Sequence, residues 1–273
     1  MDRQIAAKLG KETVSILTAG AYTGPAGNHV DVRAAADASR RATVEYGPEH
    51  QLPLPSSRNA HTQFSVENDT VLAVGRRMVA DGPVAALNFA SAMSPGGGFL
   101  NGARAQEESI ARSSALFSTL EGRAMYPFHD ARRDAMYTDY VIYSPAVPVF
   151  RTDSGDLLDE PWLLSIITCP AANGAALENY APARLGEIEA VMTTRTAKVL
   201  SVAAAHNVRR FILGAWGCGA FGLDPQMMAA IFRDAFIGPF HGVFDEIVFA
   251  VTDWSPAKTF IGPFDKVFGG GRL

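Results

Sequence analysis

Two adjacent glutamates and the glutamine before them are the residues whose types and spacing best suit proton transfer. Three glycines, Gly96, Gly97 and Gly98, are followed after seven residues by Gln106-Glu107-Glu108. Adjacent residues on a helix point about 100° apart, so the two carboxylates are expected to lie differently beside a ligand. Glycine lets the preceding backbone approach that ligand without a Cβ atom in the way. The pattern therefore predicts a loop that holds a ligand against a pair of carboxylates.

Such a pair suits general acid–base chemistry at a glycosidic bond. An acid must keep its proton near neutral pH, whereas the dipole at a helix start favours the ionised form. A neighbouring carboxylate and a ligand phosphate oppose ionisation, because like charges repel. One glutamate could then donate a proton to a glycosidic oxygen and later accept one from water. Alternatively, the two glutamates only stabilise the helix, by about 0.3–1 kcal/mol each.

A second glycine-rich loop lies late in the chain and has the spacing G-x-G-x-x-G. In dinucleotide-binding folds this motif opens the first βαβ unit, and an acidic residue follows about 20 positions later. Here position 237 is isoleucine, so a nicotinamide dehydrogenase is not expected. The helix start that follows still offers unpaired N–H groups to a phosphate. The loop predicted to hold that phosphate comprises Trp216, Gly217, Cys218, Gly219, Ala220, Phe221 and Gly222.

The elements that must position these loops alternate between strands and helices. Apolar runs predict strands at 63–67, 84–90, 140–150, 162–171, 209–216 and 246–251. Helical patterns cover residues 70–81, 104–120, 184–206 and 225–237. Both glycine loops follow a strand and precede a helix, which is where open α/β sheets bind ligands. The alternation predicts an α/β fold with a mixed, largely parallel sheet flanked by helices on both faces.

The first part of the chain has a different character. A helix is predicted at 3–19, a hairpin at 21–32 and another helix at 33–46. Prolines and serines gather at 51–59, which is typical of a boundary. We therefore expect a mainly helical N-terminal accessory segment, residues 1–58, and a catalytic domain, residues 59–273.

Composition excludes several classes of function. The formal net charge of −4 argues against broad electrostatic binding of nucleic acid. The two cysteines favour a reducing cytoplasm, and no apolar run suggests a membrane span. The six histidines show no ligand spacing with each other or with a cysteine, so neither a metal nor another cofactor is expected.

The order GGG, seven residues, QEE and then "GAWGCGAFG" resembles the bacterial type of poly(ADP-ribose) glycohydrolase, which has a macrodomain fold. The segments "VAALNFASAMSPGGGF", "SPAVPVFRTDSGDLLDEPW" and "AGAYTGP" are similar to that family too. The resemblance implies poly(ADP-ribose) and ADP-ribose as ligands and ADP-ribosylated proteins as carriers of the polymer. It also implies a role in reversing ADP-ribosylation, as in a DNA damage response.

The resemblance also implies roles for individual residues. Glu108 would be the acid/base, Glu107 would bind the distal ribose, and Gln106 would orient the pair. The glycines at 96–98 would line the distal ribose and diphosphate, and the loop 217–222 would hold the diphosphate, with Phe221 against the ligand. Further contacts are expected from Glu67 to the adenine amino group and from Ser91, where some relatives carry Asn. Phe249 and Trp254 are the candidates for stacking on adenine, and the alternative for both is a place in the core.

Two alternatives share this fold and ligand. A non-catalytic reader would bind ADP-ribose without cleaving it, although a reader has no need of carboxylates beside its ligand's diphosphate. A hydrolase of mono-ADP-ribosylated proteins would use the same site on a different bond.

Overall fold

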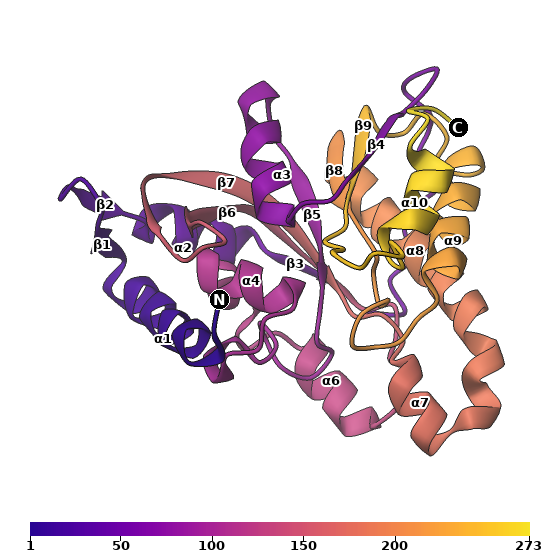
Figure 1. Ribbon diagram of the computed structural model, residues 1–273, viewed down its shortest axis with the longest axis horizontal. Helices are drawn as coiled ribbons and strands as arrows, with labels where there is room; N and C mark the ends of the chain where they lie inside the picture. Colours follow the sequence, from indigo (N-terminus) through magenta and orange to yellow (C-terminus); the bar gives the residue numbers. More distant parts are fainter.

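The computed structural model describes residues 1–273 and is built around one mixed sheet (Figure 1). Seven strands lie in the order β3-β6-β7-β5-β8-β9-β4, and a separate hairpin joins β1 to β2. Four of the six pairings in the large sheet are parallel, and those of β6 with β3 and β7 are antiparallel. The strands are β1 Ala21–Thr23, β2 His29–Asp31, β3 Val44–Tyr46, β4 Gln63–Glu67, β5 Ala85–Phe89, β6 Val141–Arg151, β7 Leu157–Cys169, β8 Arg210–Leu213 and β9 Glu246–Ala250.

Helices cover both faces of the sheet, and each face has its own apolar core. The core on one face joins the sheet to α8, α9 and α10, and the core on the other face includes residues of α1 to α6. The α-helices are α1 Arg3–Ala19, α2 Arg33–Ala42, α3 Val71–Met78, α4 Gln106–Ser113, α5 Leu116–Leu120, α6 Met125–Arg132, α7 Gly174–Tyr180, α8 Ile188–Ala205, α9 Pro225–Ile237 and α10 Ile261–Phe268. Short 3-10 turns are η1 Val79–Asp81, η2 Phe99–Asn101 and η3 Pro182–Glu187. No helix is long and apolar enough to cross a membrane.

The central strands are buried on both faces, which explains their continuous apolar sequence. Leu87 of β5, Ile212 of β8 and Ile247 of β9 are fully buried. Because β5, β8 and β9 run parallel, their carboxyl ends meet at one edge of the sheet. The GGG loop, the 217–222 loop and the segment 251–260 all leave from that edge.

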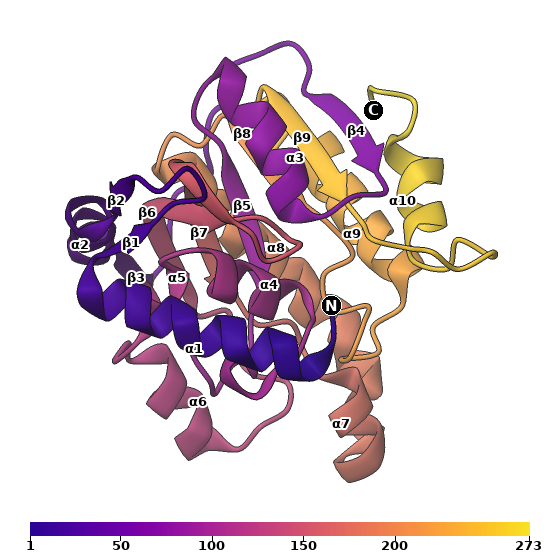
Figure 2. The ribbon, with the colours of Figure 1, turned by 60° about the vertical axis from the view of Figure 1, so that its left-hand side comes forward.

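The N-terminal segment packs against the rest of the chain in two places. Helix α1 runs along the flank of the molecule beside α4 and η2 (Figure 2). The hydroxyl of Thr13 donates to the carbonyl of Arg112 in α4. Farther along, β3 forms the edge of the large sheet by pairing with β6. The segment before the predicted boundary at residue 58 therefore contributes a strand to the large sheet. The domain boundary itself stays a prediction.

The fold class predicted from the sequence is confirmed, and most of the individual elements occur where they are expected. Strand β4 and helix α9 have the predicted bounds. The helix expected at 104–120 is instead two helices, because Ser114 is extended and bridges to Val149 of β6. The helix expected at 33–46 ends at Ala42, and its last predicted residues form the edge strand β3 instead. No sequence pattern predicts the helices α6, α7 and α10.

Candidate active site

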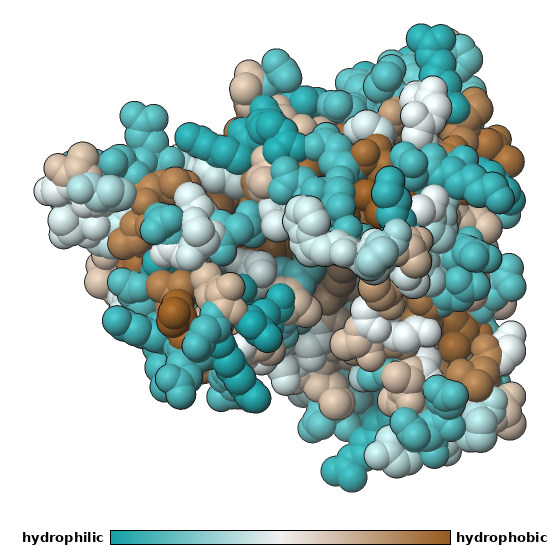
Figure 3. Space-filling view, in the orientation of Figure 1, coloured by the Kyte–Doolittle hydropathy of each residue, from teal (hydrophilic) through white to brown (hydrophobic).

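A cavity of about 570 Å³ opens at the carboxyl ends of β5, β8 and β9. Its size lies within the range of small-molecule sites. The surface is hollowed in the same region, between α4 and the C-terminal helices (Figure 3). Nine predicted site residues line this cavity: Ser91, Gln106, Glu107, Glu108, Trp216, Gly217, Gly219, Ala220 and Phe221. Six others do not line it: Glu67, Gly96, Gly97, Gly98, Cys218 and Gly222.

Glu107 is held from behind by the end of β5. Its Oε2 accepts the backbone N–H of Ser91 at 2.7 Å, and its Oε1 accepts the side-chain amide of Asn88 at 3.3 Å. The residue is only 3% exposed. Burial disfavours the charged form and raises the pKa of Glu107 to about 8. Glu107 is therefore mainly protonated at neutral pH and can donate a hydrogen bond to a ligand.

Glu108 lies beside it but has different partners. Its Oε1 accepts the backbone N–H of Gly98 at 2.9 Å. Its Oε2 is buried and makes no hydrogen bond within the protein. Since buried polar atoms are nearly always paired, an unpaired carboxylate oxygen in a cavity wall is suited to meeting a ligand.

The GGG loop packs directly on these carboxylates. Gly97 has a φ of +61°, and a Cβ atom there would lie 2.2 Å from Oε1 of Glu108 and 2.9 Å from Oε2 of Glu107. The N–H of Gly97 donates to the carbonyl of Ser94, and that of Gly98 to Glu108. This loop therefore shapes the glutamate pair, and its placement along the diphosphate stays a prediction.

Gln106 and Ser91 brace the same corner of the cavity. The side chain of Gln106 accepts the N–H of Phe89 at 2.9 Å and donates to the carbonyl of Leu87 at 2.7 Å. It makes no hydrogen bond to either glutamate, so it fixes the start of α4 to the end of β5. The hydroxyl of Ser91 accepts the N–H groups of Met93 and Ser94, which closes the turn that leads into the glycines.

The second glycine loop lines the cavity and contains free donors. The consecutive N–H groups of Gly219, Ala220 and Phe221 donate to no acceptor in the protein. Neighbouring N–H groups in a loop form a concave site for an anion. Gly217, with φ at +78°, is in a tight turn where a Cβ atom would lie 2.6 Å from Leu223. Trp216 is buried and donates from its indole N–H to the carbonyl of Cys169, and the Cys218 thiol is buried beneath the loop.

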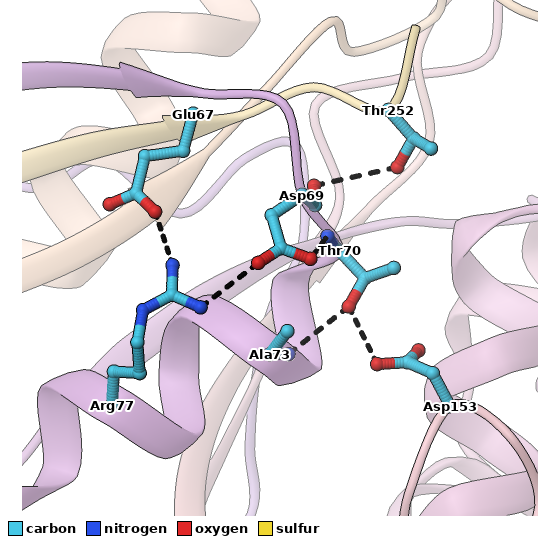
Figure 4. A network of polar contacts seen from close by, with 7 residues as sticks. All are labelled: Glu67, Asp69, Thr70, Ala73, Arg77, Asp153 and Thr252. Carbon is cyan, nitrogen blue, oxygen red and sulfur yellow. Dashed lines mark hydrogen bonds and ion pairs between the residues drawn. The ribbon is translucent and has the colours of Figure 1, made fainter. Parts of the chain in front are cut away.

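The far end of the cavity differs from the expectation. Glu67 does not line the cavity, and its contact with adenine stays a prediction. Its carboxylate pairs with Arg77, which also binds Asp69 at 2.9 Å (Figure 4). The polar groups that do line this end include Thr70 and Asp153. The hydroxyl of Thr70 donates to Asp153 at 2.6 Å and accepts the N–H of Ala73. Burial raises the pKa of Asp153.

Neither aromatic residue proposed to stack on adenine lines the cavity. Phe249 is fully buried and stacks on Phe268 with ring centroids 4.3 Å apart, so it belongs to the core. Trp254 is 81% exposed on the loop after β9. The aromatic side chain that lines the cavity from this loop is that of Phe260.

The cavity is also lined by residues that the sequence did not mark as site residues, among them Thr70, Tyr137, Asp153 and Phe260. The sequence signal for Thr70 was its position as a helix cap, and for Asp153 a turn between two strands. These patterns predict local structure and say nothing of a ligand. For Tyr137 and Phe260 no motif in the sequence marks a site.

Comparison with known proteins now gives the family. Residues 10–152, about half of the chain, match the family described as "Microbial-type PARG, catalytic domain". A crystal structure of poly(ADP-ribose) glycohydrolase from Thermomonospora curvata is 42% identical, with a TM-score of 0.90 over 98% of this chain and 99% of that chain. No curated protein was found to match the chain.

Two similar structures contain ligands. The Thermomonospora curvata enzyme bound to the inhibitor ADP-HPD is 41% identical, with a TM-score of 0.89 over 97% of this chain and 99% of that chain. The Deinococcus radiodurans enzyme in complex with ADP-ribose is 38% identical, with a TM-score of 0.82 over 86% of this chain and 97% of that chain. Together with the family match, these likenesses show that the chain belongs to the microbial-type poly(ADP-ribose) glycohydrolases and is an enzyme of that class.

Proposed function

We propose that this enzyme cleaves the ribose–ribose O-glycosidic bonds of poly(ADP-ribose) with Glu108 as general acid and base. The observation that carries the proposal is the buried, unpaired Oε2 of Glu108 in the wall of the cavity. The N–H of Gly98 fixes the other oxygen of this carboxylate. A proton-transferring group must be within reach of the reacting oxygen and correctly oriented, and this pairing supplies the orientation.

The ligand pose follows from the donors and from the order of the strands. The free N–H groups at 219–221, after β8, receive the diphosphate of the terminal ADP-ribose unit. The distal ribose then lies over the end of β5, beside Glu107 and Glu108, and the adenine lies toward β9 and Phe260. The Deinococcus radiodurans relative is observed with ADP-ribose, which supports a ligand of this kind.

The two glutamates then have different roles. Glu107, protonated at neutral pH, hydrogen-bonds the hydroxyls of the distal ribose. Glu108 donates its proton to the 2′-oxygen of the adjoining adenosine ribose as the bond from that oxygen to the distal C1″ breaks. The distal ribose passes through an oxocarbenium-like state that the nearby diphosphate stabilises. Glu108, now a carboxylate, takes a proton from the water whose oxygen bonds to C1″, and ADP-ribose is released.

Hydrolysis of purified poly(ADP-ribose) by wild type and by Glu108→Gln tests this assignment. We expect the substitution to lower the rate by about 10²–10⁴, the range for lost acid–base catalysis. Affinity for ADP-ribose, measured by calorimetry, should change by no more than a few-fold, because glutamine keeps the bond from Gly98. Two results would contradict the role of Glu108. One is a Glu108→Gln enzyme that hydrolyses polymer at the wild-type rate, and the other is a variant whose affinity for ADP-ribose falls by as large a factor as its rate.

The carrier of the polymer is part of the same proposal. ADP-ribosylated proteins would present the chain, so a mono-ADP-ribosylated protein is the informative second substrate. Release of ADP-ribose from polymer but not from the single modified side chain would support the ribose–ribose bond as the target. The reverse preference would contradict it.

A further inference from the structure

Tyr137 is a cavity-lining residue to which the mechanism above assigns no role. It lies in the segment between α6 and β6 and is half-buried. Its ring packs against that of Phe221, with centroids 6.2 Å apart. Its hydroxyl makes no hydrogen bond to any group of the protein. A tyrosine that lines a cavity with a free hydroxyl can offer both an apolar ring face and a polar group to a ligand.

The backbone of Tyr137 is in an unfavourable conformation. Its φ is +52°, in the left-handed region that bulky side chains rarely adopt. Five non-glycine residues share a positive φ, and among them Tyr137 alone is aromatic and alone lines the cavity: Arg133, Tyr137, Ala146, Asn207 and Lys258. Strained positions persist only where the surroundings fix them, and they gather at ligand sites.

A buried histidine supplies part of that support. His129 of α6 is 1% exposed, and its Nε2 accepts the backbone N–H of Thr138 at 3.2 Å and lies 2.8 Å from the Thr138 hydroxyl. Burial lowers the pKa of His129 to about 4, so the ring is neutral and can accept at physiological pH. Its ring also contacts the ring of Tyr137, with centroids 5.7 Å apart. His129 therefore positions Tyr137 through the next residue in the chain.

On the other side, Asp134 closes the turn. The N–H of Tyr137 donates to the carbonyl of Asp134 at 2.9 Å, and Met136 donates to the Asp134 carboxylate. That carboxylate pairs with Arg184 at 2.9 Å. The turn that carries Tyr137 is thus fixed to two other parts of the molecule before any ligand is present.

The sheet order shows which end of the cavity Tyr137 occupies. Strand β6 lies two positions from β5 on one side, and β9 lies two positions from β5 on the other. Neighbouring strands are about 4.8 Å apart, so residues that follow strands two positions apart are displaced along the cavity by about twice that spacing. Because β6 is antiparallel to β7, its first residue lies at the same edge as the end of β5. Tyr137 is therefore at the end opposite Thr252 and Phe260.

We propose that Tyr137 is a substrate-binding residue that, with Phe221, contacts the diphosphate and distal-ribose half of the ADP-ribose unit. This inference rests on the proposed placement of the ligand. The ring covers the apolar face of the distal sugar, and the hydroxyl donates to an oxygen of the diphosphate or the ribose. His129 is a positioning residue that keeps Tyr137 ready for this contact.

The test is calorimetric titration of Tyr137→Ala and Tyr137→Phe with ADP-ribose and, separately, with AMP, which lacks the distal half. For Tyr137→Ala we expect affinity for ADP-ribose to fall about 10–100-fold, as for the loss of a buried aromatic contact and a hydrogen bond. For Tyr137→Phe we expect about 3–10-fold, the effect of the hydroxyl alone. Affinity for AMP should stay within about two-fold in both, because that half lies at the other end. Tyr180→Ala, at an 88% exposed tyrosine, is the control and should change neither.

A purely structural role for Tyr137 would give a different result. If affinities for ADP-ribose and AMP fall together, or if neither falls, the proposal is wrong. Should Tyr137→Ala fail to fold, Tyr137→Phe keeps the ring and decides the question. His129→Gln, which can still accept from Thr138, should retain more ADP-ribose affinity than His129→Ala; equal affinities would remove the positioning role. These readouts measure binding alone, so they stand even if Glu108→Gln proves active.

Discussion

Two neighbouring residues of the same type acquire different chemistry from their partners. Glu107 is turned toward β5 and receives two donors, and Glu108 is turned toward the GGG loop and keeps one oxygen unpaired. The sequence places both acids in the first turn of a helix, where either could be a simple stabiliser. A glutamate that only stabilises a helix end has its side chain in solvent. Glu107 and Glu108 are instead only 3% and 8% exposed, so burial distinguishes them from such stabilisers.

The raised pKa of Glu107 predicts a pH-dependent stability. In the unfolded chain this carboxyl ionises near 4.5, whereas in the folded protein it ionises near 8. Between these values the unfolded state binds fewer protons, so this residue makes stability fall as pH rises from about 4.5 to 8. Glu107→Gln removes that titration. We therefore expect the melting temperature of the variant to rise relative to wild type between pH 5 and pH 8.

Thermal unfolding at pH 5, 7 and 8.5 measures this effect. Glu178→Gln, at an exposed position, is the matched control and should show no such trend. An offset between Glu107→Gln and wild type that is constant with pH would show that Glu107 does not change its proton affinity on folding.

At the level of elements, the sequence could predict the parts whose pattern is local. Buried parallel strands are continuous apolar runs, and both glycine loops follow such strands, so the edge of the sheet where the cavity opens could be inferred. The helices α6 and α10 were missed because each contains a proline, Pro127 and Pro263. Each proline is the third residue of its helix, where the missing N–H would have no partner in the helix anyway.

Other features depend on contacts that no local pattern reveals. Strand β3 is three residues long and exists through its pairing with β6, about a hundred positions away. Tertiary contacts also decide three features of the site. These are the different partners of Glu107 and Glu108, the ion pair of Glu67 with Arg77, and the presence of Tyr137 in the cavity wall. Sequence spacing therefore predicted which loops leave from the edge where the cavity opens more reliably than which side chains line it.

The GGG loop gives a prediction at the level of one element. At Gly97 an alanine would have to adopt φ near +61°, which costs about 1–2 kcal/mol, and its Cβ would collide with Glu108. We expect Gly97→Ala to lower stability by about that amount and polymer hydrolysis by at least about ten-fold, since displaced catalytic groups lose far more than their strain. Gly186→Ala, where a Cβ meets open space, is the control. Unchanged hydrolysis in Gly97→Ala would show that the loop does not set the position of Glu108.

At the scale of the whole molecule, the N-terminal helix α1 packs against α4, the helix that carries Glu107 and Glu108. Besides the bond from Thr13 to Arg112, α1 lies against η2, the turn directly after the three glycines. Gly10 makes the close approach: a Cβ there would be 2.7 Å from the carbonyl oxygen of Phe99. Since Gly98 donates to Glu108, a shift of this turn would reach the Glu108 carboxylate through two consecutive residues.

Gly10→Ala tests this coupling, because the packing against Phe99 predicts a change in the free energy of unfolding opposite in sign to the usual one. Within a helix, replacing glycine with alanine normally stabilises by about 0.8–1 kcal/mol. Here the added methyl group would meet backbone that cannot rotate away, so we expect destabilisation of about 1–3 kcal/mol, as for an overpacked core. We also expect slower polymer hydrolysis, although the residue lies outside the cavity. Urea unfolding and steady-state hydrolysis measure the two effects. A more stable and fully active Gly10→Ala would mean that α1 covers α4 without constraining it.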